Sequence, residues 1–138
     1  MTLHMKHALL ALLVCSLVLS GGLERSFFLA DNTPICLIVV PDDAEITDLF
    51  NAAQISEEII DLAGSGCPFS LIRFAEEISR RDTVKNNLIM LGETGLSITG
   101  EFTEIAEGLY LYKDPFGTKR DVLVVENPQS LLDLLEEL

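Results

Sequence analysis

Three short runs of apolar residues divide this 138-residue chain, and they lie within residues 35–40, 87–91 and 121–126. Each run is too short for a helix and lacks the alternation of a half-exposed strand, so each predicts a strand that is buried on both faces. Residues 109–112 alternate leucine with tyrosine and predict a less buried strand. The pattern over residues 102–106 is ambiguous between helix and strand.

The longer stretches between these runs have helical periodicity. Residues 43–63 predict one amphipathic helix, with acidic residues largely on its polar side and an apolar face formed by Ile46, Leu49, Phe50, Ala53, Ile60 and Ala63. Asp42 and Glu45 resemble a capping box at its start, and Gly64 a C-cap at its end.

Two further helices are expected. One runs from about Pro68 to Arg80, because apolar residues recur at helical spacing at Leu71, Phe74, Ala75 and Ile78. The other closes the chain, with Asn127 as N-cap, Pro128 in the first turn and a wide leucine stripe behind them. That stripe either docks onto the sheet or faces a partner.

Strands that alternate with helices predict an α/β fold. We expect a two-layer or three-layer sandwich around a small, mostly parallel, Rossmann-like sheet of three to five strands. Residues 35–138 would form this single domain, and residues 23–34 a short lead-in.

Residues 1–22 have the order of a secretory signal. Lys6 precedes an apolar run over residues 8–19, and Ser20, Gly21 and Gly22 supply small residues for a cleavage point. Cleavage is expected after Gly22, with Ala30 a poorer second choice. The alternative is a retained N-terminal anchor, which would be the chain's contact with a membrane.

Charge limits the function classes. The chain has 9 Lys and Arg against 22 Asp and Glu, a net charge of −13, so overall electrostatic attraction to nucleic acid or anionic lipid is excluded as its main activity. Both histidines, His4 and His7, lie in the signal-like segment. After cleavage no imidazole would remain for a histidine base, and we expect no catalytic residue and no enzyme activity.

Two sets of residues are candidates for a disulfide or a metal. Cys36 and Cys67 could pair outside the cell, or Cys36 could be a core residue and Cys67 a loop thiol. Asp42, Asp43 and Glu45 could offer oxygen ligands to Ca²⁺, although helix capping explains them more simply and the EF-hand pattern is absent. No other cofactor is expected.

The loops after residues 35–40 and 87–91 are where an open α/β sheet would bind a small molecule or nucleotide. Residues 92–95, Gly-Glu-Thr-Gly, lack the full glycine fingerprint and the P-loop lysine, and Glu93 would repel a phosphate. A small-molecule or nucleotide-binding protein is therefore the alternative reading.

Three segments form a recurring pattern: residues 38–55, an apolar strand, acidic loop and Ala-rich helix; residues 82–92, with Asn87-Leu88-Ile89-Met90-Leu91-Gly92; and residues 115–138, the last strand and helix. Together they resemble archaeal S-layer proteins of the methanogen and Thermococcales type. Gln54 replaces an aspartate of that pattern, and Glu93 a glycine. The chain would be a short, single-domain relative.

The resemblance implies a secreted or cell-surface structural domain without enzymatic activity. Its partners would be other cell-surface proteins or further copies of itself.

The signal assignment predicts a mature protein that begins at Leu23. Intact-mass spectrometry of the chain exported by a secreting host should give the mass of residues 23–138, lowered further by two hydrogens where Cys36 and Cys67 are joined. Recovery of the uncleaved chain from the cytoplasm would contradict the assignment.

Overall fold

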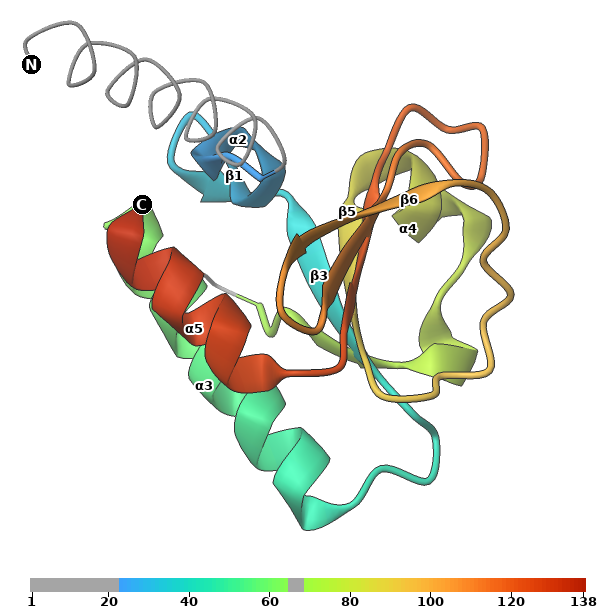
Figure 1. Cartoon of the computed structure of the whole chain (residues 1–138), viewed down its shortest axis with the longest axis horizontal. Helices are drawn as coiled ribbons and strands as arrows, with labels where there is room; N and C mark the ends of the chain where they lie inside the picture. The colour runs from blue at the N-terminus through green and yellow to red at the C-terminus, as the bar shows by residue number, and fades with distance from the viewer. Residues whose placement is uncertain (1–22, 65–68) are drawn as a thin grey trace, which may run out of the picture.

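The computed structural model describes residues 23–64 and 69–138, which form an α/β fold around a mixed six-stranded sheet (Figure 1). The strand order is β4-β3-β5-β8-β7-β6. The first four strands of that order are mutually parallel, and β7 and β6 run antiparallel to their neighbours. The bounds are β3 Cys36–Val40, β4 Ile72–Phe74, β5 Asn87–Leu91, β6 Phe102–Ala106, β7 Leu109–Tyr112 and β8 Val122–Val125.

The α/β class and the three central strands are confirmed. Every residue of β3 and β5 is buried, as two-sided burial predicts. The sheet has six strands rather than three to five, because β4 and β6 were not predicted as strands.

The helix expected over residues 68–80 is wrong. Ile72–Phe74 is instead strand β4, followed by one 3-10 turn, η1 (Ala75–Glu77), and a short helix, α4 (Arg80–Lys85). The amide of Ile38 donates to the carbonyl of Leu71 at 2.7 Å, so the backbone here pairs with β3 rather than with itself. Leu71 and Ala75 are both buried, and a strand that runs into a tight turn also produces this four-residue spacing.

Two long helices cover one face of the sheet. Helix α3 (Ile46–Ala63) and helix α5 (Pro128–Glu137) lie side by side there (Figure 1). Leu131 and Leu135 of α5 are buried in the main core, so the leucine stripe docks onto the sheet. On the other face, Leu37, Val39, Met90 and their neighbours are covered by η1 and by loop residues such as Leu96, Ile98 and Phe116.

Helix α3 spans almost the predicted range but faces the core with a different side. Its buried residues are Ala52, Ile55, Ser56, Ile59 and Ala63. Most of the predicted apolar face points to solvent, since Ile46 is 85% exposed and Phe50 62% exposed. Ile55 and Ile59 lie about half a turn around the helix from Ile46, and their side packs on the sheet.

The helix caps follow the sequence closely. Asn127 caps α5 and accepts a hydrogen bond from the Ser130 amide, with Pro128 in the first turn. Gly64 ends α3 at φ 74°, as expected of a C-cap. The capping box at the start of α3 is formed by Glu45 and Asp48, one turn later than predicted.

Residues 23–34 belong to the folded body. They form a short helix, α2 (Arg25–Phe28), and a small two-stranded ribbon of β1 (Leu29–Ala30) and β2 (Thr33–Pro34). Leu23, Phe27, Phe28 and Leu29 join the main core. Cleavage after Ala30 would therefore remove four buried side chains, whereas cleavage after Gly22 would leave them. Residues 1–22 lie outside the described ranges, and within those ranges no helix has the length and apolar character needed to cross a membrane.

A buried asparagine connects this N-terminal segment to the sheet. The Nδ2 of Asn87 donates to the Phe27 carbonyl at 2.8 Å, and its Oδ1 accepts from the Asp121 amide at 2.9 Å. The Asn87 amide itself donates to the Ile35 carbonyl. One side chain at the start of β5 therefore fixes α2 and the start of β8.

Asn87→Leu should lower the free energy of unfolding by roughly 2–4 kcal/mol, because each buried backbone group left without a partner costs about 1–3 kcal/mol. Urea unfolding followed by circular dichroism measures the change. Asn86→Ala is the matched control, since the Asn86 side chain makes a single long hydrogen bond of 3.5 Å to the Asp82 carbonyl; it should stay within about 0.5 kcal/mol of wild type. Equal stability of Asn87→Leu and wild type would contradict the assigned role.

Candidate functional site

The parallel strands end beside a pocket of about 490 Å³. It lies where β5 and β8 end and where α3 and α5 begin, the position at which α/β sheets bind ligands. The loop after β5 lines it, as the sequence predicted, but the loop after β3 does not. The lining residues are Asp48, Asn51, Leu91, Gly92, Glu93, Val124, Val125, Glu126 and Pro128.

This pocket is acidic. Asp48, Glu93 and Glu126 contribute carboxylates, and among the described residues that line it there is no lysine, arginine or histidine. These carboxylates would repel the negative charge of a phosphate group placed in the pocket. The described lining therefore offers no side-chain cation to a phosphate group.

A second hollow, of about 280 Å³, lies on the other side of the Gly92–Gly95 turn. Met90, Leu96, Ile98 and Val124 give it a mainly apolar wall. Two polar contacts lie within this wall: the Thr94 hydroxyl donates to the Met90 sulfur at 3.7 Å and accepts from the Leu96 amide at 3.3 Å. Thr94 therefore orients the turn.

Two of the three carboxylates predicted to bind calcium hold backbone groups. Asp42 Oδ1 accepts a hydrogen bond from the Glu76 amide at 2.9 Å, which ties the loop after β3 to η1. Glu45 belongs to the α3 capping box, and Asp43 is exposed. Among the residues that the structure describes, no group of three or more His, Cys, Asp or Glu could hold a metal ion. Calcium at Asp42, Asp43 and Glu45 stays a prediction.

The predicted disulfide involves one described residue. Cys36 begins β3 and is buried in the main core. Cys67 falls in the 65–68 segment outside the described ranges, so the pairing also stays a prediction.

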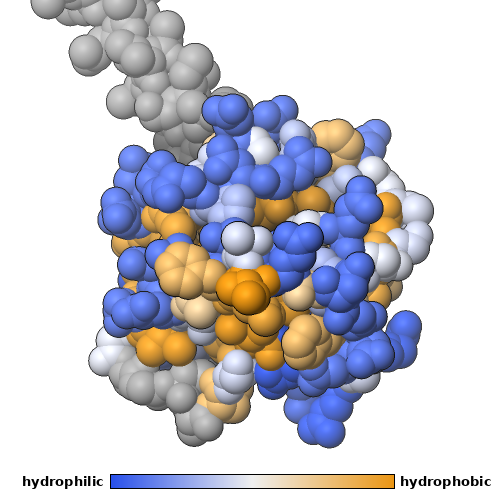
Figure 2. Space-filling view, turned by 90° about the horizontal axis from the view of Figure 1, so that it is seen from below, coloured by the Kyte–Doolittle hydropathy of each residue, from blue (hydrophilic) through white to orange (hydrophobic). Residues whose placement is uncertain are grey.

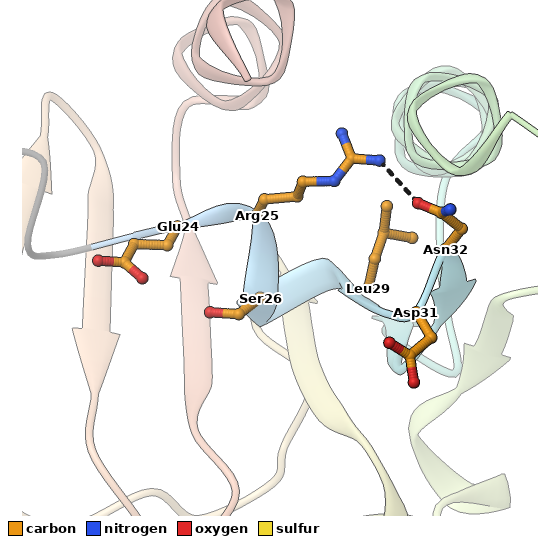
Figure 3. A pocket seen from close by; sticks show the side chains of 6 residues that line it. All are labelled: Glu24, Arg25, Ser26, Leu29, Asp31 and Asn32. Carbon is orange, nitrogen blue, oxygen red and sulfur yellow. Dashed lines mark hydrogen bonds between the residues drawn. The ribbon is translucent and has the colours of Figure 1, made fainter.

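A wide, shallow hollow lies beside the N-terminal segment, and its polar residues hold that segment to the rest of the fold (Figure 3). Arg25 and Asn32 point toward one another across it, and the Arg25 guanidinium donates to Asn32 Oδ1 at 3.1 Å and to the Leu62 carbonyl at 2.9 Å. Leu62 lies in the last turn of α3, where the helix dipole favours a cation. Arg25 thus stabilises the attachment of α2 to α3.

Three aromatic rings from two strands form a surface that we call the aromatic strip: Phe102, Tyr110 and Tyr112. The ring of Phe102 meets Tyr110 edge-on at 5.5 Å between centroids and Tyr112 at 5.4 Å. Phe102 is 55% exposed. The Leu-Tyr alternation of β7 predicted the half-exposed tyrosines, but no pattern in residues 102–106 indicated the partner ring.

Negative charge surrounds the hydroxyl of Tyr110. The Tyr110 hydroxyl donates to Glu126 Oε2 at 3.4 Å, and Glu104 lies directly opposite Tyr110 on β6. The charge of Glu126 raises the pKa of Tyr110, with partial burial, Glu104 and the hydrogen bond adding to the increase. The aromatic strip is therefore an electronegative surface.

Helix α3 presents a second unpartnered apolar feature, the α3 stripe, which consists of Ile46, Leu49 and Phe50. These residues are spaced three and four apart and so share one side of the helix. Figure 2 views the molecule from the end at which α3 begins, and apolar side chains gather near the centre of that face within a hydrophilic surround. Exposed apolar patches with a polar rim are typical of interaction surfaces.

The comparisons with known proteins assign no family to these surfaces: no protein-family model matches the chain, and no curated protein is significantly similar to it.

Removal of the Glu126 charge should lower the pKa of Tyr110 toward its ordinary value, because the carboxylate disfavours a second negative charge on the phenolate. Ultraviolet titration of Glu126→Gln in a Tyr112→Phe background isolates this hydroxyl. Glu136→Gln, near the far end of α5, is the control and should leave the titration unchanged. The same midpoint with and without Glu126 would contradict the assignment.

Proposed function

We propose that this chain is a secreted or cell-surface, non-catalytic domain that associates with further copies of itself, in the manner of an S-layer subunit. The α3 stripe carries the proposal. Ile46, Leu49 and Phe50 begin a helix whose opposite end is firmly packed, so they are held in place and face outward.

The α3 stripe lies on a separate side of α3 from the one that packs on the sheet. At about 100° per residue, its centre lies roughly a third of a turn from the side that packs on the sheet. No rotation of α3 could bury both sides, since Ile55 and Ile59 are fully buried already. Because no part of the described ranges covers the stripe, we infer that a second copy does.

The energy available to self-association is modest. Full burial of an isoleucine, leucine or phenylalanine side chain contributes about 1.5–3 kcal/mol. Three residues on each of two copies supply on the order of 10 kcal/mol, and association costs about 4–15 kcal/mol in lost freedom. We therefore expect a weak contact that depends on concentration and that a lattice would strengthen by repetition.

Charge makes this association sensitive to ions. Each copy carries a net charge of −13, and Asp48 and Glu45 lie within the same helix start. Screening shortens the reach of that repulsion to about 10 Å at 0.1 M salt. Salt and Ca²⁺ should both favour association, since both reduce the repulsion between acidic copies. The calcium role predicted for Asp42, Asp43 and Glu45 would then act between copies.

The remaining features support the proposal. β3, α3 and β4 form a parallel strand-helix-strand unit, which is compatible with the Rossmann-like sheet that the alternation of strands and helices predicts. The acidic pocket argues against the alternative of a nucleotide-binding protein. The buried Leu23 and Phe27 fit a mature chain that begins just after a signal at residues 1–22.

Sedimentation velocity over a wide concentration range tests the proposal, in low salt, in high salt and with CaCl₂. The wild-type protein should associate, most strongly with Ca²⁺. Replacement of both Ile46 and Phe50 by Gln should weaken association by at least about tenfold, a change of 1.4 kcal/mol. It should leave thermal stability nearly unchanged, because both side chains are exposed.

Val84→Gln is the control, since Val84 is 47% exposed on α4, away from the stripe. A monomer under every condition, or equal weakening by the control, would overturn the proposal. A thermal-shift response to nucleotide without one to Ca²⁺ would favour the alternative instead.

A further inference from the structure

Strand β6 has its outer backbone edge uncovered within the described part of the chain, where it is the last strand of the sheet. In an antiparallel pair, alternate residues direct their N–H and C=O groups away from the neighbouring strand. On β6 those groups face outward over residues 101–104, all of which are exposed. An edge of this kind is a template for another strand.

A bulge protects part of this edge and leaves the rest available. The register between β6 and β7 shifts between Glu104 and Ala106, and Ile105 turns into the main core. Bulges interrupt pairing. The part of β6 that can accept a strand is therefore the segment that carries Phe102 and Glu104.

The side chains beside this segment select the charge of an added strand. Glu101, Glu104 and Glu107 are exposed along β6 and its following turn, and Glu126 contacts the Tyr110 hydroxyl. The lysine that follows β7, Lys113, is paired with Asp121 at 3.1 Å. The local field is thus negative, as the raised pKa of Tyr110 also indicates.

We propose that β6 and the aromatic strip bind an extended peptide segment of another protein that carries lysine or arginine at alternate positions. The segment adds to the sheet as a seventh strand by backbone pairing along residues 101–104. Its basic side chains lie on the face of Phe102, Tyr110 and Tyr112, where cation–π contacts and the carboxylates of Glu104 and Glu126 both favour a cation.

A second copy of this chain is a poorer partner for this edge than a basic segment, because it brings further carboxylates to an acidic surface. Antiparallel pairing of two β6 strands centred on Glu104 would set the two Glu104 side chains opposite one another, and like charges directly opposite destabilise a strand pair. The inference goes beyond the self-association proposed above, since it uses a different surface and a different partner.

A short peptide of alternating lysine and valine is the probe, titrated into the ¹⁵N-labelled full chain by NMR. The amide shifts should map to residues 101–104 and to β7. Two peptide controls separate the contributions: an alternating glutamate-valine peptide should not bind, and a lysine-valine peptide with alternate N-methylated amides should lose most of the affinity, because it keeps the charge but cannot pair.

Protein variants test the side chains. Glu104→Gln should weaken binding roughly two- to fivefold, as expected for one exposed ion pair, and Phe102→Ala should weaken it by a similar factor through the lost cation–π contact. Glu136→Gln on α5 should have no effect. Several results would overturn the inference: no binding, equal binding of the N-methylated peptide, equal effects of Glu104→Gln and Glu136→Gln, or shifts that map to β4.

Discussion

Two-sided burial of the central strands is the constraint on which the rest of this fold depends. β3 and β5 are buried at every residue, so both faces of the sheet must be covered. The two long helices, α3 and α5, lie side by side and cover one face (Figure 1). Covering that face fixes the rotation of α3, with Ile55 and Ile59 inward. Its first turns then carry Ile46 and Phe50 outward, where no other described segment covers them.

The same constraint explains why the polar surfaces lie where they do. The turn between β6 and β7 must approach the start of α5, and Gly108 makes this possible. Its φ is 74°, and a Cβ there would lie 2.6 Å from the Cβ of Asn127. The Gly108 carbonyl accepts from the amides of Glu126 and Asn127. Glu126 consequently serves both the pocket at the strand ends and the aromatic strip.

The sequence predicts best what the buried centre determines. The runs at 35–40, 87–91 and 121–126 became β3, β5 and β8, because a strand covered on both faces must be apolar throughout. Asn127 and Pro128 marked the start of α5 through local hydrogen bonding and backbone geometry. The edges of the sheet carry no such signal. β4 is three residues long, and most of β6 is exposed, so its composition reflects solvent rather than a core.

Two features of the candidate surfaces could not be predicted from the sequence, each for a physical reason. Periodicity shows that α3 has apolar sides but not which one the sheet will cover. Here the small residues Ala52, Ser56 and Ala63 on the buried side allow close packing. The aromatic strip depends on pairing between β6 and β7, which sets Phe102 opposite Tyr112. The position of Glu93, by contrast, follows from the sequence, since it comes directly after the strand-ending Gly92 and lines the pocket at the strand ends.

Methyl NMR of isoleucine-labelled protein tests most directly that α3 turns one apolar side to the core and another to a second copy. The account predicts that the Ile55 and Ile59 methyl groups show nuclear Overhauser effects to sheet residues such as Ile38 and Ile89 at every concentration. The Ile46 methyl should show none to the sheet and should shift progressively as concentration rises. An Ile46 methyl that contacts the sheet, or one whose signal is unchanged from dilute to concentrated solution, would contradict it.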